Sequence, residues 1–197
     1  MFNGIIFNQG TIKRIIKKKI GTYFFLKSDI KVNKKSIGIS ISCDGVCLTL
    51  ISFKKKILGF YLSKETINRS KFKKSKIGDK INLELPLKFG NKISGHICQG
   101  HVDTVAHINK IIKQGKSYVY DFKINKNFKD ILINKASILV NGVSLTISKI
   151  TKNGFQIWLI PHTLKLTNLS NIKKNTVVNI EFDILSKYVK KYILWKN

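Results

Sequence analysis

Proline, cysteine and arginine are scarce in this chain of 197 residues, and long apolar runs are missing. Only Pro86 and Pro161 occur, so no proline-rich linker marks a domain boundary. The three cysteines, Cys43, Cys47 and Cys98, are an odd number without paired spacing, which favours free thiols in a reducing cytoplasm. No apolar run approaches the roughly 18 residues that span a bilayer, and no basic start precedes an apolar core as in a secretion signal. We therefore expect a soluble, cytoplasmic, enzyme-sized protein.

The positive charge comes almost entirely from lysine. The chain has 37 Lys and Arg residues against 10 Asp and Glu, a formal net charge of +27, and only Arg14 and Arg69 are arginines. Such a charge attracts nucleic acid, but proteins that read grooves and phosphates rely on the bidentate guanidinium group. The lysines are scattered, and the clusters at 17–19 and 54–56 suit the tips of turns, because lysine is readily left in water. We expect a solvated surface, and neither a nucleic-acid nor a membrane partner.

An internal repeat divides the chain. Residues 44–49, Asp-Gly-Val-Cys-Leu-Thr, recur 97 positions later at 141–146 as Asn-Gly-Val-Ser-Leu-Thr. Three further pairs of segments match at this shift or at one residue less: 62–66 with 159–163, 78–84 with 175–181, and 3–6 with 99–102. Matches in one order at nearly one shift predict a tandem duplication of a domain of roughly 90 residues.

Each half has the pattern of a small all-β domain. Residues 36–41 alternate polar and apolar, the dipeptide at 44–45 predicts a tight turn, and residues 46–53 continue as a second strand. The Asn-Gly dipeptide at 141–142 predicts the same hairpin in the second half. Many short strands with regular turns favour a closed barrel in each half, because closure removes exposed sheet edges. Further strands are expected at 60–62, 80–85, 118–124, 156–160 and 177–182.

The C-terminal tail differs from the rest. Ser186 is a candidate helix cap, and an apolar stripe recurs at helical spacing through Leu185, Tyr188, Val189, Tyr192 and Ile193. The first half has no equivalent, so we expect the stripe to contact another subunit and not its own domain. The predicted division is 1–96, 97–185 and a terminal oligomerisation helix at 186–197.

Five segments resemble, in order, the riboflavin synthase alpha-chain family: 1–6 (MFNGII), 44–49 (DGVCLT), 95–103 (GHICQGHVD), 141–146 (NGVSLT) and 160–164 (IPHTL). The resemblance runs to about residue 193 and includes the family's own duplication. It implies an all-β chain of two tandem duplicated six-stranded Greek-key barrels plus a C-terminal helix that gathers three chains into a homotrimer. It further implies a working site between the N-terminal barrel of one chain and the C-terminal barrel of its neighbour, with lumazine synthase as a candidate partner.

The implied activity is that of a transferase. Two molecules of 6,7-dimethyl-8-ribityllumazine exchange a four-carbon unit and give riboflavin and 5-amino-6-ribitylaminouracil. One lumazine loses a proton from its C7 methyl group, and the other is attacked after a nucleophile adds at its C7. Proximity of two rings can supply roughly 7 to 11 kcal/mol of such a barrier, which leaves acid/base groups and dipoles to the protein. No metal or redox cofactor is expected, and two similar pockets suit two identical substrates.

Carried over position by position, the resemblance places Ser40 and Cys47 as polar or nucleophilic candidates in the N-terminal barrel, across the turn from one another. Without the resemblance, a strand cysteine would be read as a small buried hydrophobe. The further substrate-binding positions implied for this half are Gly4, Ile5, Ile6, Leu48, Thr49, Tyr61, Leu62, Ser63, Lys64, Glu65 and Thr66.

In the second half, His101 is the acid/base candidate because imidazole titrates near neutral pH. His96 is a second candidate, with a structural hydrogen-bonding role as the alternative. The two histidines lack the carboxylate or cysteine spacing that would complete a metal site. Asp183 matches an important family position or else caps the C-terminal segment. The implied substrate-binding positions are Gly100, His101, Val102, Lys135, Ser144, Leu145, Thr146, Leu159, Ile160, Pro161, His162, Thr163 and Leu164.

Asn141 departs from the family pattern, because members often have Asp there, and it weakens any role that needs a carboxylate at that turn. Two other functions stay open. A non-catalytic lumazine or flavin carrier of the same fold needs only one competent pocket, whereas Ser40, Cys47, His101 and Lys135 together favour the enzyme. A basic barrel could instead stack RNA bases on aromatic side chains beside lysines. We assign these aromatics to the barrel core: Tyr23, Phe24, Phe25, Phe53, Phe60 and Tyr61.

Overall fold

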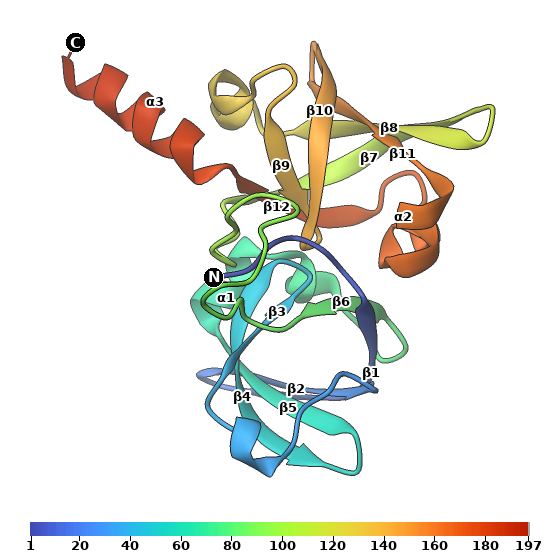
Figure 1. Ribbon diagram of the computed structural model, residues 1–197, viewed down its shortest axis with the longest axis vertical. Coiled ribbons are helices and arrows are strands. Elements are labelled where there is room, and N and C mark those ends of the chain that lie inside the picture. The colour runs from blue at the N-terminus through green and yellow to red at the C-terminus, as the bar shows by residue number, and fades with distance from the viewer. Residues whose placement is uncertain (197) are drawn as a thin grey trace.

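The chain folds as two closed antiparallel barrels of six strands each, one above the other in Figure 1. The computed structural model describes the backbone of residues 1–196 and the side chains of residues 1–195, so the predicted segment 186–197 extends one residue beyond it. The strand order is β1-β2-β5-β4-β3-β6 in the first barrel and β7-β8-β11-β10-β9-β12 in the second, which is the same order in equivalent strands. The predicted duplication of a six-stranded barrel is confirmed.

Short helical segments connect the strands at matching places in the two halves. The first barrel consists of β1 (Asn8–Lys18), β2 (Gly21–Ser28), β3 (Ser40–Cys43), β4 (Val46–Lys54), β5 (Ile57–Ser63) and β6 (Lys80–Glu84), with η1 (Lys34–Ser36), α1 (Lys64–Arg69) and η2 (Lys71–Lys74). The second consists of β7 (Thr104–Gln114), β8 (Ser117–Ile124), β9 (Ser137–Val140), β10 (Val143–Thr151), β11 (Gly154–Leu159) and β12 (Val177–Phe182), with η3 (Lys126–Ile131), α2 (Pro161–Leu166) and η4 (Asn168–Asn171).

The two predicted hairpin turns form and lie against each other where the barrels meet. Asp44 and Gly45 have φ of 47° and 79°, and Asn141 and Gly142 have φ of 46° and 77°. Positive φ at both central residues is the geometry that Asp-Gly and Asn-Gly favour. A Cβ added to Gly45 would lie 2.9 Å from the Gly142 backbone nitrogen. Glycine is therefore required at both positions for two reasons: the positive φ of the turn and the close approach of the barrels.

One strand was predicted with the wrong start, and two long strands were not predicted. The strand expected at 36–41 begins only at Ser40, because Asn33 caps a 3-10 turn and Gly38 turns the chain with φ of 97°. The long strands β1 and β7 were missed. A bulge between Ile12 and Arg14 in β1, repeated in β7, shifts the alternation of side chains part-way along the strand, so the period of two is broken.

Each barrel has its own apolar core, but the segments that lead into the barrels are exchanged. Ile6 precedes the first barrel and is buried in the core of the second. Val102 precedes the second barrel and packs against the core of the first. The two leading segments pair through a backbone bridge between Phe2 and Cys98, with N–H···O distances of 2.8 and 3.1 Å. The barrels are thus related by an approximate twofold axis that passes between these segments.

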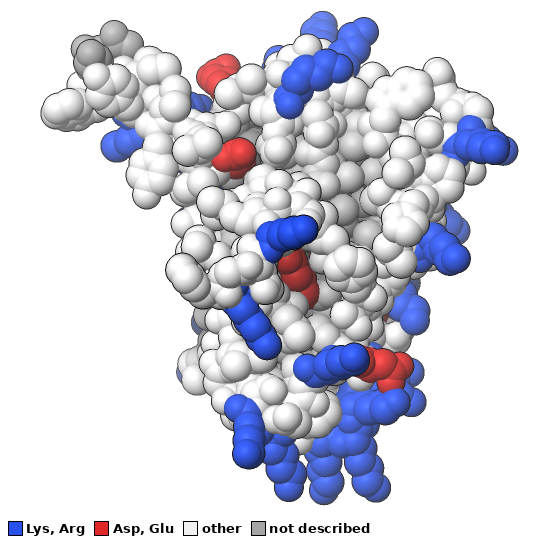
Figure 2. Space-filling view, in the orientation of Figure 1, with Lys and Arg blue, Asp and Glu red and all other residues white. Residues whose placement is uncertain are grey.

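The two lysine clusters lie at or next to turns, as predicted. Lys55 and Lys56 form the β4–β5 turn, and Lys19 lies in the turn between β1 and β2. Figure 2 shows many Lys and Arg side chains at the end of the N-terminal barrel that points away from the second barrel. Of the aromatics assigned to the core, Phe24 and Phe60 are fully buried. Phe53 packs against the core from a partly buried position, whereas Tyr23, Phe25 and Tyr61 remain partly exposed.

The C-terminal helix α3 (Ile184–Lys196) projects away from the barrels (Figure 1). Ser186 is not its cap, because the helix begins earlier and the Asp183 carboxylate accepts the Leu185 N–H at 2.9 Å. Its apolar side chains include Leu185 and Tyr188, which are 70% and 69% exposed. Among the described residues no helix has the length and apolar character needed to cross a bilayer.

Candidate functional site

A pocket of about 530 Å³ opens on the outer face of the C-terminal barrel, over β10 and β11. Six of its lining residues were predicted from the sequence, and Ser148 and Trp158 were missed. Both continue the outward alternation of predicted neighbours in their strands, so the period of two could have identified them. The half-exposed indole of Trp158 gives the pocket an aromatic wall. The full lining is Lys135, Ser144, Leu145, Thr146, Ser148, Trp158, Ile160 and Thr163.

His96 reaches this pocket through Ser144. The His96 Nδ1 lies 2.7 Å from Ser144 Oγ in a hydrogen bond, and the imidazole is 9% exposed. Burial lowers the pKa of His96, and the opposing effect of Asp183 is smaller. A neutral imidazole can accept the hydroxyl proton of Ser144 at Nδ1. His96 is therefore placed to act on a bound molecule through the serine hydroxyl.

The equivalent face of the N-terminal barrel carries Cys47 in the place of Ser144. Ser42 is opposite Cys47, and Ser40 is opposite Thr49. Ser40 and Cys47 are thus diagonal neighbours on the outer face, because the residues between them point into the core. Leu48 is one of these core residues, so its predicted contact with a ligand is limited to its backbone. Ser42, which is buried beside Cys47, was not predicted.

The structure corrects which barrel receives each leading segment. We predicted Gly4, Ile5 and Ile6 at the first barrel's site, and Gly100, His101 and Val102 at the second. Instead, the Gly4 carbonyl accepts the Ser144 N–H at 2.8 Å, and the Gly100 carbonyl accepts the Cys47 N–H at 2.8 Å. The repeat shows which residues are equivalent, but it does not show that each segment crosses to the other barrel. His101 is exposed beside the Cys47 face, and His96 belongs to the Ser144 face.

Two carboxylates that are absent from our predicted site hold these segments; Glu181 is buried and Glu84 is partly buried. Glu84 accepts the N–H groups of Asn3 and Gly4 at 2.7 and 3.0 Å. Glu181 accepts those of Gln99 and His101 at 2.6 and 2.8 Å. Burial raises the pKa of Glu84 to about 7, although the backbone N–H groups oppose this. Burial also raises the pKa of Glu181 against the same kind of hydrogen bonds. The signal was available, because the two glutamates recur at the repeat's own shift.

The remaining predicted residues divide between pocket, cap and core. The side chains of Leu62 and Leu159 are fully buried in their barrels, so the predicted contact of these residues with a ligand is limited to their backbone. Tyr61 donates its hydroxyl to the Ile20 carbonyl at 2.9 Å. Ser63 caps α1 by accepting the Thr66 N–H at 3.1 Å.

Around α1 and α2, side chains at the predicted positions face solvent or a neighbouring hollow. Lys64 and Glu65 are exposed on α1, where Glu65 pairs with Arg69. Pro161 and His162 are exposed at the start of α2. Leu164 and Pro161 line a separate hollow of about 580 Å³ beside β7 and β8.

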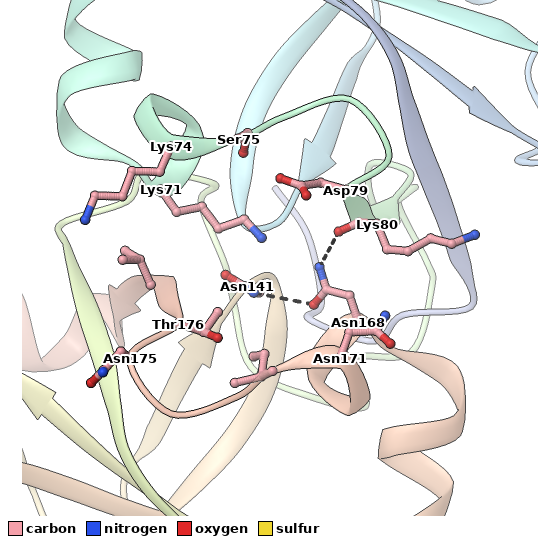
Figure 3. A pocket seen from close by; sticks show the side chains of 12 residues that line it. Lys71, Lys74, Ser75, Asp79, Lys80, Asn141, Asn168, Asn171, Asn175 and Thr176 are labelled. Carbon is pink, nitrogen blue, oxygen red and sulfur yellow. Dashed lines mark hydrogen bonds between the residues drawn. The ribbon is translucent and has the colours of Figure 1, made fainter.

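A polar hollow of about 300 Å³ lies between the barrels, and Figure 3 shows its lining. Lys71 Nζ is 2.5 Å from the fully buried Asp44 carboxylate. Asn141 Oδ1 accepts the Asn179 N–H at 2.9 Å, as Asp44 Oδ1 accepts the Asn82 N–H at 2.8 Å. The Asn141 amide oxygen therefore makes the same hydrogen bond at the second turn that the Asp44 carboxylate oxygen makes at the first. No predicted site residue lines this hollow, and its side chains fix the orientation of the barrels.

The domain family model that matches is the lumazine binding domain, at residues 3–86 and 99–183. These spans cover both barrels and both outward faces. The fold and the site thus define a protein of two tandem lumazine-binding domains.

Whole-chain relatives narrow the class. The riboflavin synthase of Photobacterium phosphoreum is 33% identical over 98% of this chain and 89% of its own length. That of Bacillus subtilis (strain 168) is 34% identical over 98% of this chain and 90% of its own. The chain belongs to the riboflavin synthase family.

Solved structures of LumP share the fold. LumP complexed with riboflavin superposes with a TM-score of 0.83 at 25% identity, over 92% of this chain and 99% of that one. LumP complexed with 6,7-dimethyl-8-(1'-D-ribityl) lumazine gives a TM-score of 0.80 at 26% identity, over 92% and 98%. This fold therefore accommodates both ring systems in a protein similar to this one.

Proposed function

We propose that the protein is a riboflavin synthase that forms one riboflavin and one 5-amino-6-ribitylaminouracil from two molecules of 6,7-dimethyl-8-ribityllumazine. The observation that carries the proposal is the pair of equivalent outward faces. One presents the thiol of Cys47, and the other presents a pocket with the Ser144 hydroxyl bonded to His96. Two similar sites with different reactive groups suit a reaction in which identical substrates take different parts.

Each site offers groups that the reaction needs. Proton removal from the C7 methyl group requires a base, and addition at C7 of the second lumazine requires a nucleophile. In the C-terminal barrel, a neutral His96 can draw the Ser144 proton, while Lys135 at the pocket wall can stabilise negative charge on the ring. In the N-terminal barrel, Cys47 and Ser40 share a face that is completed by the segment carrying His101.

Both sites lie open on the surface of one chain, which supports an assembly that closes them. The exposed apolar face of α3 fits the association of three chains, with the N-terminal site of one facing the C-terminal site of its neighbour. A homotrimer would exclude water from the paired rings and supply proximity. The free thiols of Cys43, Cys47 and Cys98 support a cytoplasmic location, and lumazine synthase is the proposed partner that supplies the substrate.

The test is to incubate the pure protein with 6,7-dimethyl-8-ribityllumazine alone and to follow riboflavin by absorbance and chromatography. We expect one mole of riboflavin per two of substrate, with the activity lost in Cys47→Ala or His101→Ala. Tight binding without turnover would instead favour a carrier of the same fold. Absence of binding would rule out both functions.

A further inference from the structure

The N-terminal segment is clamped between the two barrels at Gly4. On one side, Glu84 of β6 in the first barrel accepts the N–H groups of Asn3 and Gly4. On the other side, the Gly4 carbonyl accepts the N–H of Ser144, in the second barrel's pocket. A Cβ added to Gly4 would lie 2.6 Å from the Ser144 Cβ. The segment therefore has little freedom while both contacts hold.

The junction segment is clamped in the same way with the barrels interchanged. Glu181 of β12 in the second barrel accepts the N–H groups of Gln99 and His101. The Gly100 carbonyl accepts the N–H of Cys47 in the first barrel, and a Cβ added to Gly100 would lie 2.5 Å from the Cys47 Cβ. Each carboxylate thus lies in one barrel while the segment that it holds borders the reactive residue of the other.

We infer that Glu84 and Glu181 are positioning residues that act crosswise: Glu84 sets the wall of the C-terminal barrel's lumazine site, and Glu181 that of the N-terminal barrel's. Neither carboxylate needs to contact the ligand, and the inference rests on the proposed function of the two sites. Removing one leaves two backbone N–H groups without acceptors, and a partly buried N–H without an acceptor is costly. The segment then moves toward other partners, and the site against which it packs loses a wall.

Each site has a reporter of its own. Trp158 lines the C-terminal pocket, and substitution of the exposed Trp195 by Phe leaves it as the single tryptophan. Incorporated 5-fluorotryptophan then gives one ¹⁹F resonance that reports ligand at that pocket. Cys47 is partly exposed, whereas Cys43 and Cys98 are buried, so iodoacetamide should reach Cys47 first. Protection of Cys47 from alkylation reports ligand at the N-terminal barrel. Riboflavin is the probe, because the product binds without being consumed.

In Glu84→Ala we expect the riboflavin affinity measured at Trp158 to weaken by roughly ten-fold or more, with the protection of Cys47 unchanged. In Glu181→Ala we expect riboflavin to protect Cys47 less well, with the affinity measured at Trp158 unchanged. The conservative variants Glu84→Gln and Glu181→Gln keep one acceptor oxygen and should weaken riboflavin binding at the same sites by a smaller factor. They allow the test to be made even if the alanine variants fold poorly. Asp29→Asn, which removes an exposed carboxylate of the first barrel, is the matched control and should change neither reporter.

Weakening of the site in the same barrel as the mutated glutamate, or of both sites equally, would overturn the crosswise inference and leave the proposed function standing. If the unmodified chain shows riboflavin at neither reporter, the proposed function fails and this inference fails with it. A crossed pattern supports both.

Discussion

At the scale of single residues, equivalent positions in the two halves carry different chemistry. Cys47 and Ser144 are related by the repeat, yet only the serine has a buried histidine on its side chain. One site therefore has a hydroxyl–imidazole pair and the other has a thiol, and substitutions should separate their contributions.

Replacement of His96 by Asn should lower riboflavin formation by about 10²-fold or more, as expected when an acid/base group is lost. Burial lowers the pKa of His96, so its neutral form persists to a pH below its usual range. Protonation then removes the acceptor for the Ser144 hydroxyl. We expect an acidic decline of kcat/KM that is centred below about 6.5 and is absent in His96→Asn. An unchanged pH profile in the variant would exclude this role.

Glu84 should make the protein less stable as the pH rises toward neutrality. Its pKa is about 7 in the folded chain and about 4.3 when unfolded, so between these values the folded state binds more protons. The stabilising contribution is fully present below the unfolded value and is lost as the pH passes through about 7. Urea unfolding of the wild type and Glu84→Gln at several pH values measures this. The difference between them should change across that range, and a constant difference would contradict the assignment.

At the scale of elements, the two turns that touch across the barrel interface are constrained by both dihedral angle and space. Gly45→Ala meets a positive φ and a backbone nitrogen at 2.9 Å, whereas Gly78→Ala meets a positive φ of 95° with nothing within 4 Å. We expect about 1–2 kcal/mol of destabilisation from the φ alone in Gly78→Ala. Gly45→Ala should add about 1–3 kcal/mol from overpacking. If the two variants lose the same unfolding free energy in urea, the close approach of the barrels does not add to the destabilisation in Gly45→Ala.

The hairpins could be predicted because Asp44-Gly45 and Asn141-Gly142 specify their turns locally. The long strands β1 and β7 could not, since a bulge in each shifts the alternation that marks a strand. Much of the C-terminal pocket was anticipated from the family resemblance, and the outward alternation along the strands could have added Ser148 and Trp158. The exchange of leading segments was not, because sequence equivalence gives no information about which barrel a segment contacts. Glu84 and Glu181 could have been noticed because they recur at the repeat's shift, but the segments that they hold were identified only from the structure.

At the scale of the whole molecule, the exposed apolar face of α3 should determine the assembly. Val189 and Ile193, with Ile131 and Ile133, line a groove of about 320 Å³ between the helix and η3. The double variant Val189→Asp and Ile193→Asp should shift the protein from the proposed trimer to a monomer in light scattering, with its β-sheet circular dichroism retained. Riboflavin formation should fall by at least about 10²-fold, because paired rings lose their proximity.

Lys191→Glu, an exposed change on the same helix, is the control and should leave the assembly unchanged. A fully active monomer in the double variant would contradict a site shared between chains.

A symmetric exchange of leading segments is the arrangement that two identical chains adopt about a twofold axis. In an ancestor that encoded one barrel, each segment would have docked on a partner chain, and both sites would have been identical by necessity. Fusion of two copies made the axis approximate, and each half could then change alone. The equivalent positions now carry different residues, Asp44 and Asn141 at one and Cys47 and Ser144 at the other. A single polypeptide of this kind can hold two copies of one molecule in chemically different surroundings, which an unfused symmetric pair cannot do.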